Sequence, residues 1–408
     1  MNFSLPSILL CASLFSITAP SASARVYTGM EVFLDKYTNM VAGKRVGLVT
    51  NPTGVNANLQ HTADLLKSSG KVNLTALLAP EHGIRGNVAA GEKVSGGIDA
   101  KTGLPIFTLY GNKDHKPTKE ALDKVDVIIY DIQDVGSRAY TYIWHLAECM
   151  SAAAAAGKTV IVLDRPNPLG ANVVDGPVSE EKYLSFIGLY PIPRVYGMTV
   201  GELALYLNAE EKINCKLHVI PMANFKRGMS WEQTGLPWVM TSPHIPTPQA
   251  AYCFAATGTI GEIGCLSTGI GYTIPFQAVA APWINAEAAA LALNRLQLPG
   301  VRFRPVYYKP YYAAFKDQNI SGVQLHVTDP GVFKPATTET AILCYLQKAY
   351  PTFLKWNPAK LDIFDKSMGT ASVRKAVIAG QSYKQIADSW EKKSSIFSKK
   401  RAKYLIYK

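Results

Sequence analysis

The chain has 408 residues, of which 48% are hydrophobic and 18% charged, and it carries a formal net charge of +12 at pH 7. This composition is typical of a globular protein of two or three domains with a sizeable core, and it excludes an intrinsically disordered chain. The positive charge favours an acidic partner such as a wall polymer or a membrane surface. Because the basic residues are dispersed until the helical sequence at 392–401, we interpret them as a solvated surface and predict no nucleic-acid partner.

Residues 1–24 have the features of a cleavable export signal. They contain no Asp, Glu, Lys or Arg, carry an apolar run over 5–15, and end in a small-Xaa-small pattern that closes at Ala24. An uncleaved anchor is the alternative, but the apolar run is shorter than the roughly 20 residues that a membrane span needs. We therefore expect cleavage after Ala24 and a mature protein, without an integral membrane segment, that is periplasmic or secreted.

Strand and helix patterns alternate through the first half of the chain. Aliphatic and β-branched runs predict five strands, at 45–50, 72–79, 105–110, 125–130 and 159–163. Helical patterns lie between them, at 59–68 and 139–156. Because the strands lack period-two alternation, both faces of the sheet should be buried, which predicts a mainly parallel α/β sheet with helices on both faces.

The second half has a different organisation. Prolines interrupt the pattern from 175 to 248, and a glycine-rich stretch covers 258–271. After 286, helix and strand patterns resume, which predicts a smaller C-terminal α+β domain. We place the first domain at 25–285 and the second at 286–408.

Polar clusters follow four of the predicted strands at the point where each apolar run stops. They begin at Asn51, Glu81, Asp131 and Asp164, and Tyr110 ends the remaining strand at the same edge. In open parallel sheets, ligands bind in the crevice outside the carboxyl ends of the strands. The clusters therefore predict one site, to which Asn51 and Tyr110 contribute as substrate-binding residues.

Glu81 is the candidate catalytic acid. It lies in the run 80–86, Pro-Glu-His-Gly-Ile-Arg-Gly, directly after a predicted strand. Partial shielding from water at a sheet edge favours the protonated carboxyl that a general acid needs. A structural alternative is that Glu81 caps the next helix or pairs with Arg85. His82 and Arg85 are substrate-binding candidates in the same run.

The cluster at 131–142 combines carboxylates, an amide, a guanidinium and two phenols. Such a set offers donors and acceptors for hydroxyl groups and aromatic faces for sugar rings. Alternatively, Asp134 or Ser137 caps a helix and the tyrosines belong to the core. The substrate-binding candidates of this cluster are Asp131, Gln133, Asp134, Arg138, Tyr140 and Tyr142.

The cluster at 164–170 is rigid because it contains two prolines and a glycine. Its Arg165 has the fork geometry that binds a carboxylate in bidentate fashion. We therefore add Arg165 and Asn167 to the substrate-binding candidates.

Several cofactor-binding motifs are absent from the sequence. The first strand is not followed by Gly-Xaa-Gly-Xaa-Xaa-Gly, and there is no Walker lysine and no Gly-Xaa-Ser-Xaa-Gly elbow. The seven histidines show no zinc-ligand spacing, although His82 and His115 could share a metal with Glu81. We predict no cofactor and no metal.

Five motifs, at 51–54, 80–86, 130–138, 164–168 and 197–204, occur in an order that resembles the NamZ-type exo-β-N-acetylmuramidases, a family of peptidoglycan glycosidases. The likeness continues to the C-terminal Tyr-Leu-Ile-Tyr at 404–407 and so covers the mature chain. The resemblance implies an exported enzyme with a Rossmann-like catalytic domain and a smaller C-terminal domain. It also implies release of N-acetylmuramic acid from the non-reducing end of wall glycan fragments, so the expected partners are peptidoglycan-derived amino sugars of the MurNAc-GlcNAc type.

The resemblance also implies roles for individual residues. Glu81 matches the glutamate proposed to be catalytic in that family. The positions that match its cleft-lining residues are Asn51, His82, Arg85, Asp131, Gln133, Arg138, Arg165 and Asn167.

Departures from the family pattern concentrate at 262–272. Glu262 is retained, but Thr268 stands for a second glutamate and Ile270 for an arginine. Smaller departures lie elsewhere, and His244 is one of them. If the arginine normally pairs with the lactyl carboxylate of muramic acid, its loss costs roughly 1.5 to 3 kcal/mol of binding.

Two functions therefore remain open. In the first, the protein is a glycosidase in which Glu81 protonates the leaving oxygen, and Glu262 or a residue of 131–134 is the second catalytic group. In the second, the protein is a non-catalytic or re-specified cell-wall amino-sugar-binding protein that has lost part of the site at Thr268 and Ile270.

Overall fold

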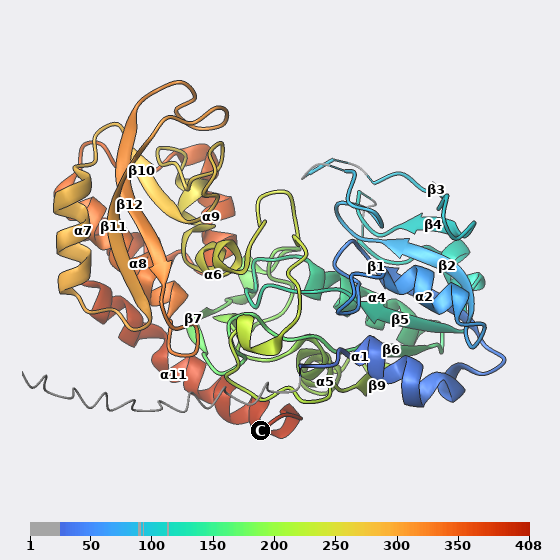
Figure 1. Cartoon of the computed structure of the whole chain (residues 1–408). Coiled ribbons are helices and arrows are strands. Elements are labelled where there is room, and N and C mark those ends of the chain that lie inside the picture. Colours follow the sequence, from blue (N-terminus) through green and yellow to red (C-terminus); the bar gives the residue numbers. More distant parts are fainter. Residues whose placement is uncertain (1–24, 89–90, 93, 112–113) are drawn as a thin grey trace, which may run out of the picture.

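The structure of the protein is a computed structural model that describes residues 25–408 except 89–90, 93 and 112–113. The predicted export signal, residues 1–24, lies outside the described residues. Two units lie side by side, a larger one built on a parallel sheet and a smaller one that contains an antiparallel sheet (Figure 1). None of the helices in the described part of the chain combines the length and apolar character needed to cross a membrane.

The larger unit contains a seven-stranded sheet in the order β3-β4-β2-β1-β5-β6-β9. All neighbouring strands are parallel except the β3–β4 pair at one edge. The strands are β1 (Arg45–Thr50), β2 (Asn73–Ala79), β3 (Gly97–Ile98), β4 (Pro105–Thr108), β5 (Val127–Asp131), β6 (Thr159–Leu163) and β9 (Lys216–Ile220). The predicted mainly parallel, Rossmann-like sheet is confirmed.

Helices cover both faces of this sheet. Successive residues of each central strand point to opposite sides, and both sides are apolar and need a cover. Ile128 and Val160 belong to one hydrophobic core, and their neighbours Ile129 and Ile161 to another. The first core includes residues of α3 (Lys119–Asp123), α4 (Tyr142–Ala155) and α5 (Val200–Glu210). The second includes residues of α1 (Gly29–Val32) and α2 (Thr62–Ser68). Buried apolar side chains on both faces explain why the strands lack polar alternation.

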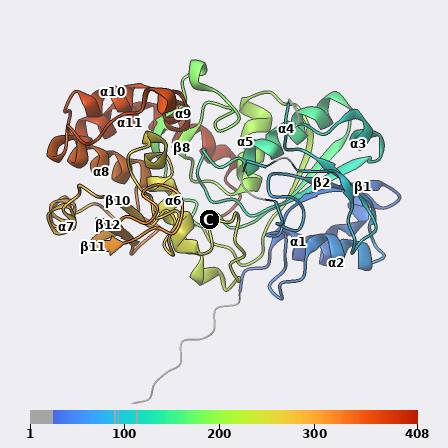
Figure 2. The ribbon, with the colours of Figure 1, turned by 90° about the horizontal axis from the view of Figure 1, so that it is seen from above.

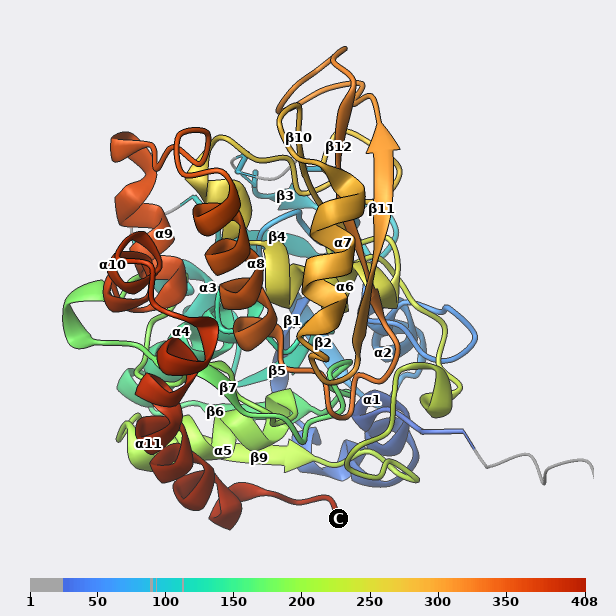
Figure 3. The same ribbon diagram turned by 90° about the vertical axis from the view of Figure 1, so that its left-hand side faces the viewer.

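The smaller unit contains an antiparallel sheet in the order β10-β12-β11. Its strands are β10 (Ala278–Ala281), β11 (Val301–Tyr308) and β12 (Ile320–Val327). Its helices, seen most clearly in Figure 3, are α7 (Ala286–Arg295), α8 (Pro335–Ala349), α9 (Leu361–Met368), α10 (Ser372–Ile378) and α11 (Tyr383–Arg401). The predicted C-terminal α+β domain is confirmed. The boundary at 285 stays a prediction, and β10, which precedes that boundary, pairs with β12.

Further elements connect the two units. They are β7 (Asp175–Val178) and β8 (Pro193–Val195), which pair with each other, and α6 (Pro248–Thr257), which lies between the units in Figure 2. Short turns of 3-10 or π helix are η1 (Phe33–Tyr37), η2 (Thr38–Val41), η3 (Glu181–Tyr183), η4 (Glu232–Thr234), η5 (Ile260–Ile263), η6 (Pro358–Lys360) and η7 (Ala402–Tyr404).

Buried polar side chains hold the units together. The guanidinium of Arg138 is fully buried and donates to the carbonyl oxygens of Pro177 at 2.8 Å and Ser367 at 2.9 Å. Burial lowers the pKa of Arg138 to about 9. After α11 the chain returns to the larger unit, where the Tyr407 hydroxyl donates to the Asp164 carboxylate at 2.6 Å. The relative position of the two units is therefore fixed by contacts close to the carboxyl edge of the sheet.

Candidate active site

The carboxyl edge of the parallel sheet brings the polar clusters together. Thr50 at the end of β1 pairs in register with Asp131 at the end of β5, and Val49 pairs with Leu78 near the end of β2. Because these strands end at the same level, Asn51 and Glu81 emerge at one rim with Asp131. The clusters that are distant in sequence thus lie along a single edge of the sheet.

Glu81 is held at this rim by hydrogen bonds from neighbouring segments. The Gly91 N–H donates to Oε1 at 3.1 Å, and the Thr141 hydroxyl donates to Oε2 at 3.3 Å. Thr141 is the N-cap residue of α4, so the carboxyl group lies at the positive end of a helix dipole. The Glu81 side chain is only partly buried, so a ligand can reach it. The alternative pairing with Arg85 is not observed.

Aromatic side chains surround Glu81 on one side. Burial and then the nearby Glu81 carboxylate raise the pKa of Tyr110 to about 12. The Tyr110 ring lies 5.8 Å from the ring of His115 and 6.2 Å from that of His145. Burial lowers the pKa of His145 to about 3, so this imidazole is neutral at physiological pH. His145 therefore adds no charge to the side of the site behind Tyr110.

His82 has an unusual backbone conformation next to Glu81. Its φ is 70°, in the left-handed region that few residues other than glycine adopt. The side chain is buried, and Nδ1 lies 3.1 Å from the carbonyl oxygen of Val88. Strained backbone of this kind concentrates at functional sites.

Arg85 is engaged with protein carboxylates. Its Nη2 lies 2.8 Å from both Asp64 and Asp99. The Arg85 guanidinium holds the pKa of Asp99 far below its ordinary value. The structure therefore places Arg85 in an ion-pair network that anchors the loop after Glu81.

Arg165 and Asp131 form a buried ion pair. Arg165 Nε lies 2.6 Å from Asp131 Oδ1, and Arg165 Nη2 lies 2.9 Å from Asp131 Oδ2. The two side chains are 4% and 0% exposed. Arg165 Nη2 also donates to the carbonyl oxygen of Val55 at 2.9 Å. The fork geometry predicted for a substrate carboxylate is thus occupied by a carboxylate of the protein.

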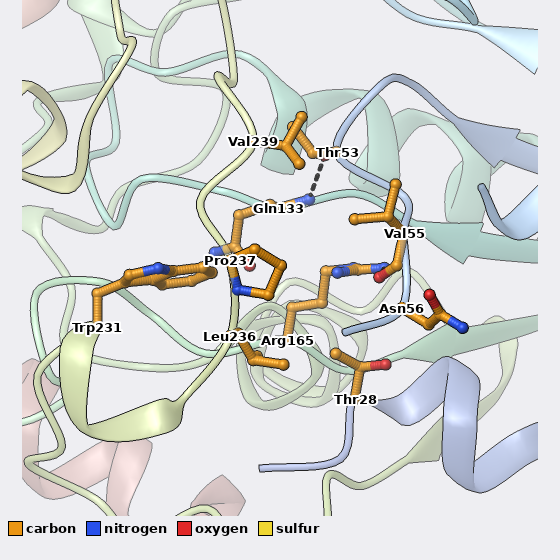
Figure 4. Close-up of a pocket in the computed structure, with 10 residues that line it drawn as sticks. All are labelled: Thr28, Thr53, Val55, Asn56, Gln133, Arg165, Trp231, Leu236, Pro237 and Val239. Atoms are coloured by element: carbon orange, nitrogen blue, oxygen red, sulfur yellow. Dashed lines mark hydrogen bonds between the residues drawn. The ribbon is translucent and has the colours of Figure 1, made fainter. Parts of the chain in front are cut away.

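A narrow pocket lies beside this pair (Figure 4). Trp231 and Pro237 lie next to Gln133 there, and the Gln133 N–H donates to Thr53 Oγ1 at 2.9 Å. The Gln133 Oε1 atom is buried and has no hydrogen-bond partner in the described part of the chain, and the cavity beside it, about 10 Å³, has room for a water molecule but not for a sugar ring. The lining residues are Thr28, Thr53, Val55, Asn56, Gln133, Arg165, Trp231, Leu236, Pro237 and Val239.

Asn51 and Asn167 shape the turns of the rim. The Asn51 Oδ1 atom accepts from the Thr53 N–H at 3.0 Å. Asn167 Nδ2 donates to the Met198 carbonyl oxygen at 2.8 Å, and a Cβ atom at Gly136, where φ is 81°, would collide with Asn167 Oδ1. Both amides are buried and hold the loops that follow β1 and β6.

The other candidates of the second cluster are buried, and the Tyr142 hydroxyl lies near Asn51 and Glu81 at the rim. The Tyr142 hydroxyl donates to the Thr241 carbonyl oxygen at 2.5 Å, and the Tyr140 ring packs edge-on against Tyr142 and Phe254. With Arg138 in its buried network, these side chains lie in the core and hold neighbouring loops, as the structural alternative expected.

Asp134 is a buried carboxyl group that accepts hydrogen bonds from the Tyr196 hydroxyl and the Gly136 N–H. Burial raises its pKa from 3.8 to about 6. Between these values the unfolded chain loses the proton and the native protein keeps it. The free energy of unfolding therefore falls by about 3 kcal/mol as the pH rises through this window.

We expect Asp134→Asn to remove this dependence, so that the difference in unfolding free energy between variant and wild type changes by about 3 kcal/mol from pH 4 to pH 7. Urea unfolding at a series of pH values measures it. Asp35→Asn is the control because the Asp35 side chain is 70% exposed. Parallel pH curves for wild type and Asp134→Asn would contradict the expectation.

Glu262 and the two main departures from the family pattern, Thr268 and Ile270, lie in the smaller unit. Glu262 is on η5, which packs against α9, and its side chain is partly exposed. Its role as the second catalytic carboxyl stays a prediction. Thr268 is buried beside Gly261, and Ile270 is partly exposed.

Sequence reasoning missed Thr141 and Gly91 as partners of Glu81, and Trp231 and Pro237 as walls of the pocket. Thr141 carried no clear signal, because it lies inside the helix predicted at 139–156, whereas the observed α4 begins one residue after it. Gly91 and Trp231 carried none, since their loops have no periodic pattern.

Comparison with known proteins identifies relatives over nearly the whole chain. The N-terminal model of exo-β-N-acetylmuramidase NamZ matches residues 46–249, and the C-terminal model matches residues 252–407. The peptidoglycan β-N-acetylmuramidase NamZ of Bacillus subtilis is 42% identical over 402 residues, which cover 96% of each chain.

Two crystal structures of DUF1343 family proteins from Bacteroides fragilis are also similar. The first has 43% identity and a TM-score of 0.88, and the second has 30% identity and a TM-score of 0.72. Each similarity covers 94% of this chain and 99% of the other. Because both family models match and a NamZ enzyme is similar from end to end, the chain belongs to the NamZ family of exo-β-N-acetylmuramidases.

Proposed function

We propose that this protein is an exo-acting glycoside hydrolase that releases N-acetylmuramic acid from the non-reducing end of peptidoglycan fragments, with Glu81 as general acid and base. The observation that carries the proposal is the Glu81 carboxyl group, partly exposed at the rim and held by the Gly91 N–H and the Thr141 hydroxyl. The likeness to the B. subtilis peptidoglycan β-N-acetylmuramidase supports the substrate class. We also propose that the signal at 1–24 directs export, which would bring the protein to the compartment that contains wall fragments.

In the proposed reaction, protonated Glu81 gives its proton to the glycosidic oxygen while the bond from this oxygen to the anomeric carbon breaks. A second carboxyl group stabilises the positive charge that develops on the sugar, or activates the water that replaces the leaving group. Glu262 is our candidate for this second group. Water supplies the hydroxyl of the released N-acetylmuramic acid. The other proton of this water goes to Glu81 where the second group only stabilises charge, and to the second group where that group activates the water.

Chromogenic glycosides test the proposal directly. We expect the purified protein to release 4-nitrophenol from the N-acetylmuramic acid glycoside and to leave the matching N-acetylglucosamine glycoside intact. Release from the glucosamine compound alone would show a changed specificity, which Ile270 in place of arginine favours. Binding of N-acetylmuramic acid without release from either compound would support the amino-sugar-binding alternative.

A further inference from the structure

Four tyrosines gather at the β11–β12 end of the smaller unit, and two of them are exposed while Tyr308 is buried beneath. The Tyr272 ring stacks on Tyr308 with centroids 5.0 Å apart and lies 5.5 Å from the Tyr311 ring. Tyr311 is 65% exposed and Tyr312 is 50% exposed. We call Tyr272, Tyr308, Tyr311 and Tyr312 the tyrosine strip. Two adjacent large rings open to solvent beside a stacked pair make a surface that can bind a ligand.

The connection between β11 and β12 presents this strip in a defined conformation. The Tyr311 N–H donates to the Gly271 carbonyl oxygen at 2.7 Å, and a Cβ atom at Gly271, where φ is 88°, would collide with the Tyr312 carbonyl oxygen. Ala313, Phe315 and Asp317 all have φ between 61° and 64°. Non-glycine residues rarely adopt the left-handed region, and those that do concentrate at functional sites. The loop is therefore held in a strained conformation that displays the tyrosines.

A chain of contacts links the strip to Glu81. Glu81 accepts from Thr141, and the next residue, Tyr142, donates to the carbonyl oxygen of Thr241. Three residues further on, His244 Nε2 lies 3.1 Å from the Tyr312 hydroxyl. Burial and then the charge of His82, the neighbour of Glu81, lower the pKa of His244.

His244 places one end of the tyrosine strip near the rim, because it contacts the Tyr312 hydroxyl and lies close enough to His82 to feel its charge. The β11–β12 connection that carries Tyr312 lies on the upper side of the smaller unit in Figures 1 and 3.

We propose that the tyrosine strip is a stacking platform for the pyranose rings on the leaving-group side of the glycan chain. This inference rests on the proposed function. An exo-acting enzyme holds the terminal sugar at the rim of the larger unit, so only the remainder of the glycan extends toward the smaller unit. The C–H face of a pyranose ring packs on aromatic rings, and phenol hydroxyls bond its hydroxyl groups. The platform would bind uncharged amino-sugar rings.

The test compares two substrates. One is a glycan that can reach the tyrosine strip, and the other is a nitrophenyl glycoside whose leaving group is too small to reach it. For Tyr311→Ala and Tyr312→Ala, kcat/KM is measured on a MurNAc-GlcNAc tetrasaccharide and on 4-nitrophenyl N-acetylmuramic acid. We expect the ratio of the two values to fall roughly three- to tenfold, as expected for the loss of one aromatic stacking contact. Tyr307→Ala is the matched control because Tyr307 is 64% exposed and its hydroxyl contacts Glu287 of α7.

A ratio that stays at the wild-type value in both strip variants, or that falls equally in Tyr307→Ala, would overturn the inference. Failure of the proposed function is distinguishable, because wild-type protein would then release nothing from either compound. Calorimetric titration of the tetrasaccharide into Glu81→Gln protein tests the platform without turnover. There, Tyr311→Ala should raise Kd by a similar factor, and an unchanged Kd would equally overturn the inference.

Discussion

Replacing Glu81 with Gln is expected to lower kcat for release of N-acetylmuramic acid from a wall disaccharide by roughly 10²- to 10⁴-fold, the range that general acid–base catalysis contributes. Gln keeps the size of the side chain and an oxygen that can accept from the Gly91 N–H at the observed 3.1 Å. It has no proton to give to the leaving oxygen. Initial rates of product release measure the effect, and the thermal unfolding midpoint checks that the variant is folded.

A change of leaving group distinguishes a general acid from a residue with another catalytic role. A nitrophenolate ion is a much weaker base than a sugar alkoxide and leaves without full protonation. The loss caused by Glu81→Gln should therefore be much smaller on the 4-nitrophenyl glycoside than on the disaccharide. Glu262→Gln is the informative comparison, because a charge-stabilising group acts on both leaving groups alike. Equal losses on both substrates in Glu81→Gln would contradict the acid role.

Strand prediction succeeded where a strand is buried on both faces. The predicted strands at 45–50 and 159–163 coincide with β1 and β6, whose aliphatic runs lie in the middle of the sheet. β9 was missed because it is an edge strand with alternating exposure, and its sequence, Lys-Leu-His-Val-Ile, mixes polar and apolar residues. β11 was also missed, although its alternating burial is the usual signature of a half-buried strand.

The position of the site could be predicted, but the partners of its long side chains could not. Strand ends indicate which edge a residue occupies, since parallel strands end together. Whether an arginine faces a ligand depends on carboxylates and carbonyls from distant segments. Asp99 for Arg85 and Ser367 for Arg138 are such partners, and neither has a sequence signal that connects it with its arginine.

The tyrosines of the second cluster illustrate the same limit. Tyr140 and Tyr142 lie in a polar run, which favoured a sugar-binding role. Their rings pack into the core that covers one face of the sheet, where α6 contributes Phe254, and the Tyr142 hydroxyl lies near Asn51 and Glu81, so their sugar-binding role stays a prediction. The aromatic surface that is exposed comes from the β11–β12 connection, whose tyrosines follow no motif of the parallel sheet.

Among the substitutions proposed here, we expect the largest loss of stability when the buried ion pair of Arg165 and Asp131 is broken. Arg165→Met would leave the Asp131 carboxylate fully buried at the end of β5, with the Thr62 hydroxyl still donating to it. Breaking a buried ion pair by removing one partner costs roughly 3 to 5 kcal/mol, because the remaining charge is uncompensated. We expect a loss of this size in the free energy of unfolding at pH 7, measured by urea unfolding followed by tryptophan fluorescence.

An exposed ion pair of similar geometry provides the control. Arg45 Nη2 lies 2.7 Å from Asp126, but the two side chains are 45% and 36% exposed. Because water and salt screen such a pair, Arg45→Met should cost roughly 1 kcal/mol or less. The double variant Asp131→Asn/Arg165→Met should recover most of the stability lost in Arg165→Met, since no unpaired charge remains. If the double variant recovers nothing, or if the two single substitutions cost the same, burial of the charge is not what makes Arg165 necessary.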